Sequence, residues 1–272
     1  ERPTVGGITD EGARQDMVAE FSWLYRQMSR EVREIFAPFF LWFEMPTILI
    51  CLRFSRGKDR QRPAARLSHS LLSPEMKLLL TADAETADIV KSLGFRFASV
   101  AEPFRSLGEI YRKQGGNAVE QRFINLYLER MSGAPLHPLL GNFFRSFIDL
   151  QNLVTLAKQI RWQLQDPQAF INGGVISTAL LAAALKDDGV ARLTALVISL
   201  TEKGVAVERP ETAHLHLLRW LTGRMRNIGR EPLSLGQILA YIWERFIEAH
   251  NLSLILHDGA VARDVLIEEL VT

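Results

Sequence analysis

Three segments of the chain repeat an acidic, a small polar and a basic side chain at one fixed spacing. The acids are Glu44, Asp149 and Glu248. Three residues after each acid stands a side chain that can donate and accept hydrogen bonds, namely Thr47, Asn152 and Asn251. Nine residues after each acid stands a base, namely Arg53, Lys158 and His257. Such triplets can supply catalytic acids and bases, hold chain segments together or contact another protein.

The apolar residues around the triplets predict that each lies on a helix, which limits what it can do. A step of three residues turns a helix by about 300°, so each acid shares a face with its Thr or Asn. A step of nine residues turns it by about 900°, so the base lies on the opposite face and cannot pair with the acid of its own segment. We predict inter-helix salt bridges or buried hydrogen bonds that fix the packing; contact with a partner protein is the alternative. Three acids on three bundles would rarely converge, so no catalytic residue is assigned.

The interval between the triplets indicates the domain organisation. The acids are 105 and 99 residues apart, which is too long for one unit of a solenoid. We predict three related helical bundles around a pseudo-threefold axis, with repeats at 1–72, 73–172 and 173–272. Only 43 residues precede Glu44, so the first repeat is expected to be truncated, partial or divergent.

Apolar periodicity predicts an all-α fold. The clearest stripe covers 235–252, where apolar side chains recur at helical spacing, while alternating strand patterns are scarce. The most apolar stretch, 37–52, is 16 residues long, and a bilayer-spanning helix needs roughly 20. This stretch also contains Glu44 and Pro46. We therefore predict a buried core helix there in preference to a membrane segment.

Composition and missing motifs exclude several function classes. Hydrophobic residues make up 47% and charged residues 23%, and the net charge of +1 gives no overall field that favours nucleic acid. The single cysteine, Cys51, cannot form an internal disulfide or a thiolate metal cluster. No Gly-x-x-x-x-Gly-Lys-Ser/Thr loop is present. His214 and His216 would point about 200° apart on a helix, which does not suit one metal ion. The sequence therefore predicts no cofactor and no metal site.

A basic cluster lies between residues 53 and 66. The residues at its centre are Arg56, Lys58, Arg60 and Arg62. Ser55 and Pro63 within it predict an exposed loop. Three uses are open: an ordinary solvated loop, contact with an anionic membrane surface or acidic partner, and nucleic-acid binding. No interleaved aromatic residues support the last of these.

Two parts of the sequence resemble a known family. The second triplet lies on the segment 147–158 and is followed by Phe-Ile-Asn-Gly-Gly at 170–174, and the third lies on 238–257. Acid-x-x-Asn-Leu helices, a Phe-x-x-Gly-Gly break and a final helix that contains a tyrosine occur in this order in the family of C subunits from the prokaryotic V/A-type rotary ATPases. The eukaryotic relative is the d subunit of the vacuolar proton pump. Residues 140–272 resemble this family well. The region 31–56 resembles it weakly, because Pro46 interrupts the motif and Thr47 stands in place of Asn.

The resemblance implies a non-catalytic connector in an ATP-driven, ion-translocating complex. In that family, three helical bundles form a funnel on the cytoplasmic side of the membrane rotor ring, and the base of the central stalk enters the funnel. The implied partners are the central-stalk subunits and the rotor ring, with proton or sodium as the transported ion and no small-molecule substrate. The expected location is cytoplasmic and peripheral, on the inner face of the membrane. The alternatives are a helical nucleic-acid-binding protein that uses the 53–66 cluster, and an enzyme with an unrecognised helical active site.

Overall fold

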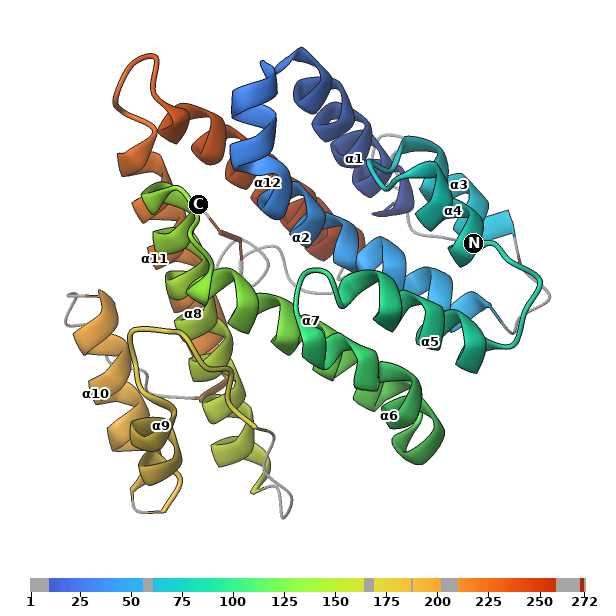
Figure 1. Ribbon diagram of the computed structural model, residues 1–272. Helices are drawn as coiled ribbons and strands as arrows, with labels where there is room; N and C mark the ends of the chain where they lie inside the picture. Colours follow the sequence, from blue (N-terminus) through green and yellow to red (C-terminus); the bar gives the residue numbers. More distant parts are fainter. Residues whose placement is uncertain are drawn as a thin grey trace. The chain divides into compact units, whose positions relative to one another are not determined.

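Helices joined by turns make up the computed structural model (Figure 1). The structure describes residues 10–55, 61–163, 169–186, 188–201, 210–257 and 270–271. No β-strand occurs among them, so the predicted all-α class is confirmed. In chain order, the helices are α1 (Asp10–Gln27), α2 (Arg30–Phe54), α3 (Gln61–His69), α4 (Pro74–Leu80), α5 (Thr86–Phe97), the 3-10 helix η1 (Glu102–Ser106), α6 (Leu107–Gln114), α7 (Gly116–Gly133), α8 (Pro138–Trp162), α9 (Thr178–Ala184), α10 (Gly189–Thr201), the 3-10 helix η2 (Pro210–Thr212), α11 (Ala213–Ile228) and α12 (Leu235–His257).

The chain divides into two compact units. One comprises Val18–Leu140, and the other comprises Glu1–Met17 together with Gly141–Thr272. Each unit has a hydrophobic core of its own, as described below. The division into three repeats about a pseudo-threefold axis stays a prediction.

Aromatic side chains fill the core of the Val18–Leu140 unit. Phe21 and Phe39 both meet Phe43 edge to face, with ring centroids 4.9 and 5.0 Å apart. This geometry adds a favourable electrostatic contact to the area that the rings bury. A second cluster consists of Phe97, Phe104 and Phe123, which joins α5, η1 and α7. The two clusters fix how the helices of this unit pack.

Helix α2 is long and apolar enough to cross a membrane, judged by length and composition alone. It begins after Ser29, whose hydroxyl accepts a hydrogen bond from the N–H of Val32 at 3.3 Å. Phe36, Ile48 and Cys51 on this helix are buried inside the unit. Burial raises the pKa of the Cys51 thiol to about 11, so the thiol stays protonated and unreactive near neutral pH. These contacts are those of a core helix.

The second unit is organised around the long helices α8, α11 and α12 (Figure 1). Helices α11 and α12 form an antiparallel hairpin, in which the indole N–H of Trp243 donates to the Thr222 hydroxyl at 3.0 Å. Both side chains are fully buried, so this bond satisfies groups that water cannot reach. Phe143 of α8 meets the Trp243 ring at 5.6 Å. The hairpin and α8 therefore share one core, and α8 carries the second polar triplet into it.

Candidate functional site

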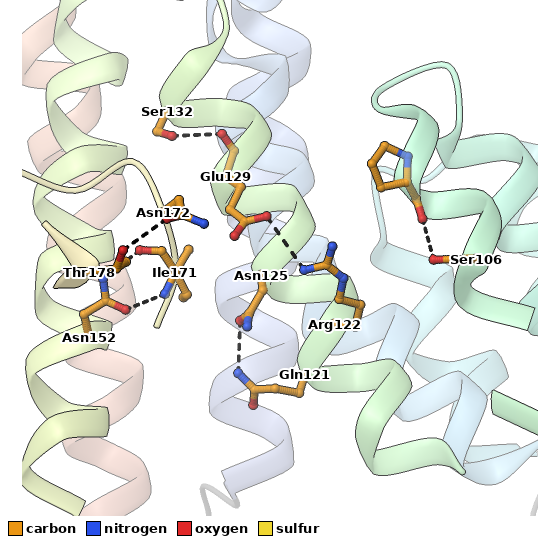
Figure 2. A network of polar contacts seen from close by, with 11 residues as sticks. Ser106, Gln121, Arg122, Asn125, Glu129, Ser132, Asn152, Ile171, Asn172 and Thr178 are labelled. Atoms are coloured by element: carbon orange, nitrogen blue, oxygen red, sulfur yellow. Dashed lines mark hydrogen bonds and ion pairs between the residues drawn. The ribbon is translucent and has the colours of Figure 1, made fainter. Parts of the chain in front are cut away.

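Asn152 joins α8 to the loop that follows it. Its side-chain N–H donates to the Ile171 carbonyl, and its carbonyl oxygen accepts the Ile171 N–H, both at 2.8 Å (Figure 2). Asn152 and Ile171 are both buried. One amide side chain thus satisfies both backbone groups of a residue 19 positions further along the chain. The loop is held at a defined place on the helix.

Asn251 makes the same pair of bonds on α12. Its side-chain N–H donates to the Val271 carbonyl at 2.9 Å, and the Val271 N–H donates back to it at 3.0 Å. The bound residue lies 20 positions after Asn251, close to the separation found for Asn152. The two asparagines of the triplets therefore have one and the same contact. Each asparagine binds a non-helical residue further along the chain, whereas the sequence favoured contacts between helices.

Asp149 holds the same loop as Asn152, a few residues further on. Its carboxylate accepts hydrogen bonds from the N–H groups of Val175 and Ile176, each at 2.9 Å. The side chain is completely buried. Burial raises the pKa of this carboxyl group, and the N–H groups of Ile176 and Val175 act in the opposite direction. Asp149 and Asn152 lie on one helical face, as their three-residue spacing requires.

Glu44 repeats the Asp149 contact in the other unit. Its carboxylate accepts the N–H of Leu71 at 2.6 Å and the hydroxyl of Ser70 at 2.8 Å. Ser70 lies 26 residues after Glu44, and Leu71 lies 27 residues after it. The two partners of Asp149 lie at the same separations from that acid. Burial raises the pKa of Glu44, and hydrogen bonds from Leu71, Ser70 and Thr47 counteract the rise. Thr47 therefore supports the acid, whereas the asparagines at its place in the other triplets bind backbone.

Glu248 departs from this pattern. Its side chain is 55% exposed, and its carboxylate pairs with Arg245 one turn earlier on the same helix. Glu248 thus lies at a surface, while Glu44 and Asp149 bind the backbone of returning loops inside their units. The three acids share a sequence spacing and do not share one environment.

The basic members of the triplets also differ from one another. Arg53 pairs with Glu120 of α7 through two nitrogen atoms, one of them 2.7 Å from the carboxylate. Lys158 is exposed on α8. Burial lowers the pKa of His214 most; the charge of His250 lowers it further, and so does the charge of Lys158. The side chain of His257 lies outside the part of the chain that the structure describes.

The centre of the basic cluster also falls outside the described residues. Arg56, Lys58 and Arg60 are not described, and nothing is described of the Arg62 side chain. The segment was predicted as a loop, but α3 begins at Gln61 and includes Pro63. Proline is compatible with the first turn of a helix, because the N–H that it lacks would have no acceptor there. The contact of this cluster with an anionic surface stays a prediction.

Hollows lie next to triplet residues in both units, and one of about 200 Å³ is bounded by Leu52, Arg53 and Glu120. Two others are larger. The first, of about 340 Å³, lies between α2, α4 and α5 and includes Glu44 in its wall. The second, of about 310 Å³, is bounded by Lys158, Arg161 and His214. Both carboxylate oxygens of Glu44 already accept hydrogen bonds from Ser70 and Leu71. Among the described residues, no group of three or more His, Cys, Asp or Glu side chains could hold a metal ion.

These features define an all-helical protein whose repeated polar residues mostly secure its own loops. The sequence model of the ATP synthase (C/AC39) subunit family matches residues 4–258. That match covers most of the chain, so the chain belongs to this family and is one of the subunits of a V/A-type ATPase. The resemblance noted in the sequence is thereby confirmed. No individual curated protein matches the sequence.

Proposed function

We propose that this chain is the non-catalytic connector that joins the central stalk of a V/A-type rotary ATPase to its membrane rotor ring. The match to the ATP synthase (C/AC39) subunit family is the observation that carries the proposal. In this function, the chain couples ATP hydrolysis or synthesis in the catalytic head to the passage of protons or sodium ions through the ring. It acts as a cytoplasmic, peripheral protein on the inner face of the membrane, where its helical bundles form a funnel for the stalk.

The hydrogen bonds of the triplets suit a part that transmits torque. A connector has to keep its shape under load, because any yielding of its loops would absorb the rotation that it should pass on. Asn152 and Asn251 each fix both backbone groups of a loop residue, and Asp149 fixes two further N–H groups. Close-packed interiors with satisfied polar groups have few alternative arrangements. We therefore assign a stiffening function to these residues.

A reconstitution experiment tests the proposal. The purified chain is mixed with the cognate stalk subunits, and binding is followed by size-exclusion chromatography and calorimetry. We expect a stable complex that buries at least about 1,000 Å² of surface, and no nucleotide hydrolysis by the chain alone. A chain that stays separate from folded stalk subunits, or that hydrolyses ATP unaided, would contradict the proposal.

The basic cluster is tested in the same system. Replacing Arg56, Lys58, Arg60 and Arg62 by glutamine is expected to weaken docking to ring-containing vesicles, more at low salt than at high salt, because mobile ions screen such attraction. A titration with duplex DNA addresses the nucleic-acid alternative, which predicts binding that falls steeply as salt rises. Arg53, which was counted with this cluster, is already paired with Glu120. We expect no DNA binding at physiological salt.

A further inference from the structure

The hollow beside Lys158 combines an apolar wall with groups that can carry positive charge. It has a volume of about 310 Å³ and lies between the second half of α8 and the start of α11. Lys158 and Arg161 of α8 border it together with His214 of α11, and Val154 and Ala157 contribute apolar surface. Lys158 and Arg161 stand three residues apart, so they share one face of α8. Among the described residues that bound the hollow, none is acidic.

The charges of the two bases on α8 are not neutralised by this part of the chain. Neither Lys158 nor Arg161 makes a hydrogen bond or an ion pair with another described residue. By contrast, the exposed Arg226 of the same unit pairs with Glu244. The guanidinium carbon of Arg161 lies 6.0 Å from the centre of the Trp162 ring, within the range of a cation–π contact. That contact leaves the N–H groups of Arg161 available to a ligand.

The electrostatic surroundings of His214 indicate that the potential in the hollow is positive. Burial lowers the pKa of His214 most, and the charges of His250 and then Lys158 lower it further. The two charges that act on His214 are thus both of one sign. The ring of His250 on α12 lies 6.3 Å from that of His214, and the charge of Arg14 on α1 acts on His250 in turn. A bound anion would offset this repulsion.

We propose that this hollow is a binding site for a phosphate monoester, supplied by a free nucleotide or by a lipid headgroup. A phosphate monoester carries nearly two negative charges near neutral pH and has three strong acceptor oxygens. These match the ammonium group of Lys158, the guanidinium group of Arg161 and the imidazole of His214. A carboxylate has one charge and two oxygens, so it would leave one of the three groups without a partner.

The wall of the hollow also offers a place for the rest of such a ligand. Trp162 borders the hollow and is 57% exposed, so its ring is free to pack against a base or an acyl chain. A volume of about 310 Å³ is at the lower end of the range for small-molecule sites. The proposal does not depend on the proposed function, because the whole site belongs to this chain and is tested on the chain alone.

Calorimetric titration of the isolated chain at fixed ionic strength tests the site. The probes are inorganic phosphate, ADP and vesicles that contain phosphatidic acid. We expect inorganic phosphate to bind at one site, and whichever of the other two probes binds more tightly identifies the source of the phosphate. Lys158→Gln and Arg161→Gln should each weaken binding about tenfold or more, because each removes a charge-assisted hydrogen bond. Both side chains are exposed, so the melting temperatures should stay unchanged.

Arg224→Gln is the matched control. Arg224 is an exposed base of the same unit that also lies over a tryptophan ring, that of Trp220 at 5.9 Å, but it does not border the hollow. Binding should be unaffected in this variant. As an independent readout, saturating phosphate should raise the pKa of His214 in an NMR titration, because a neighbouring anion favours the imidazolium form. The exposed His69 of the other unit should not respond.

Several results would overturn the phosphate site. One is the absence of binding by all three probes, and another is undiminished binding in Arg161→Gln. A loss of binding in Arg224→Gln as large as in Arg161→Gln would reduce the effect to general attraction between charges. If the dicarboxylate glutarate binds as tightly as phosphate, the hollow selects carboxylates, as an acidic peptide would offer. None of these results bears on binding of the chain to the stalk, which is measured separately.

Discussion

Gly174 lies directly against Asp149. A Cβ atom at position 174 would stand 2.2 Å from one carboxylate oxygen of Asp149 and 3.2 Å from the Ile148 side chain. The missing side chain lets the loop come close enough for the N–H groups of Val175 and Ile176 to reach the buried carboxylate. The preceding Gly173 has a φ of +103°, a conformation that glycine adopts without strain. The contact between the loop and the helix therefore depends on the Gly173-Gly174 pair as well as on Asp149.

The first prediction concerns this close approach. Gly174→Ala should destabilise the protein by about 1–3 kcal/mol, because the added methyl group forces the loop and the carboxylate apart. Chemical denaturation measures the change. Gly133→Ala provides the control, since no atom lies within 4 Å of a Cβ at that helical position, and it should leave stability unchanged or slightly raised. Equal effects of the two substitutions would show that the loop has room to move.

The second prediction concerns Asp149 and Glu248, which hold equivalent positions in their triplets but differ in burial. Asp149→Asn keeps the size of the side chain but turns one acceptor into a donor that faces a backbone N–H. The expected loss is about 1–3 kcal/mol. Glu248→Gln should change stability by less than about 0.5 kcal/mol, because Glu248 is exposed and pairs only with Arg245 among the contacts described. Thermal unfolding of both variants at one pH checks this, and similar losses would contradict the difference in environment.

The third prediction concerns the two asparagines. Asn152→Ala leaves the buried N–H and C=O of Ile171 without partners, so a loss of about 1–3 kcal/mol is expected. Asn251→Ala should cost a similar amount, because Val271 is as buried as Ile171 and its N–H and C=O lose the same pair of bonds. Amide hydrogen exchange gives a local measure. The Ile171 amide should lose protection in Asn152→Ala and keep it in Asn251→Ala.

The sequence predicted the part of this site that depends on helical geometry. Asp149 and Asn152 do share a face, because a three-residue spacing fixes their relation once the segment is a helix. Their partners could not be predicted, since they bind the backbone of Ile171 and Val175, and every residue except proline offers the same N–H. The exposure of Glu248 could not be predicted either, because burial of a carboxylate on a helix depends on whether another segment of the chain packs against it. The Gly173-Gly174 pair was the one sequence signal of such a return.

The last prediction concerns pH and a pair of histidines in the second unit. The rings of His214 on α11 and His250 on α12 lie 6.3 Å apart, centroid to centroid. Burial lowers the pKa of both; the charges of His250 and Lys158 lower that of His214 further, and the charge of Arg14 on α1 lowers that of His250. The unfolded chain, with ordinary histidine pKa values of about 6.5, therefore binds protons more readily than the folded chain does.

Stability should consequently be complete above about pH 6.5 and fall as the pH drops below this value toward the lowered pKa values of the folded state. Urea unfolding between about pH 7.5 and about pH 5.5 covers this window. In His250→Gln the decline should be shallower, because one of the two groups no longer titrates and the other loses a positive neighbour. His69→Gln, at an exposed position of the other unit, is the matched control and should decline as steeply as the wild type. Burial raises the pKa of Glu44 and Asp149, so these carboxyl groups act in the opposite direction in both proteins, and the slope is compared between wild type and variant. A His250→Gln variant with an unchanged slope would contradict the neutral histidine pair.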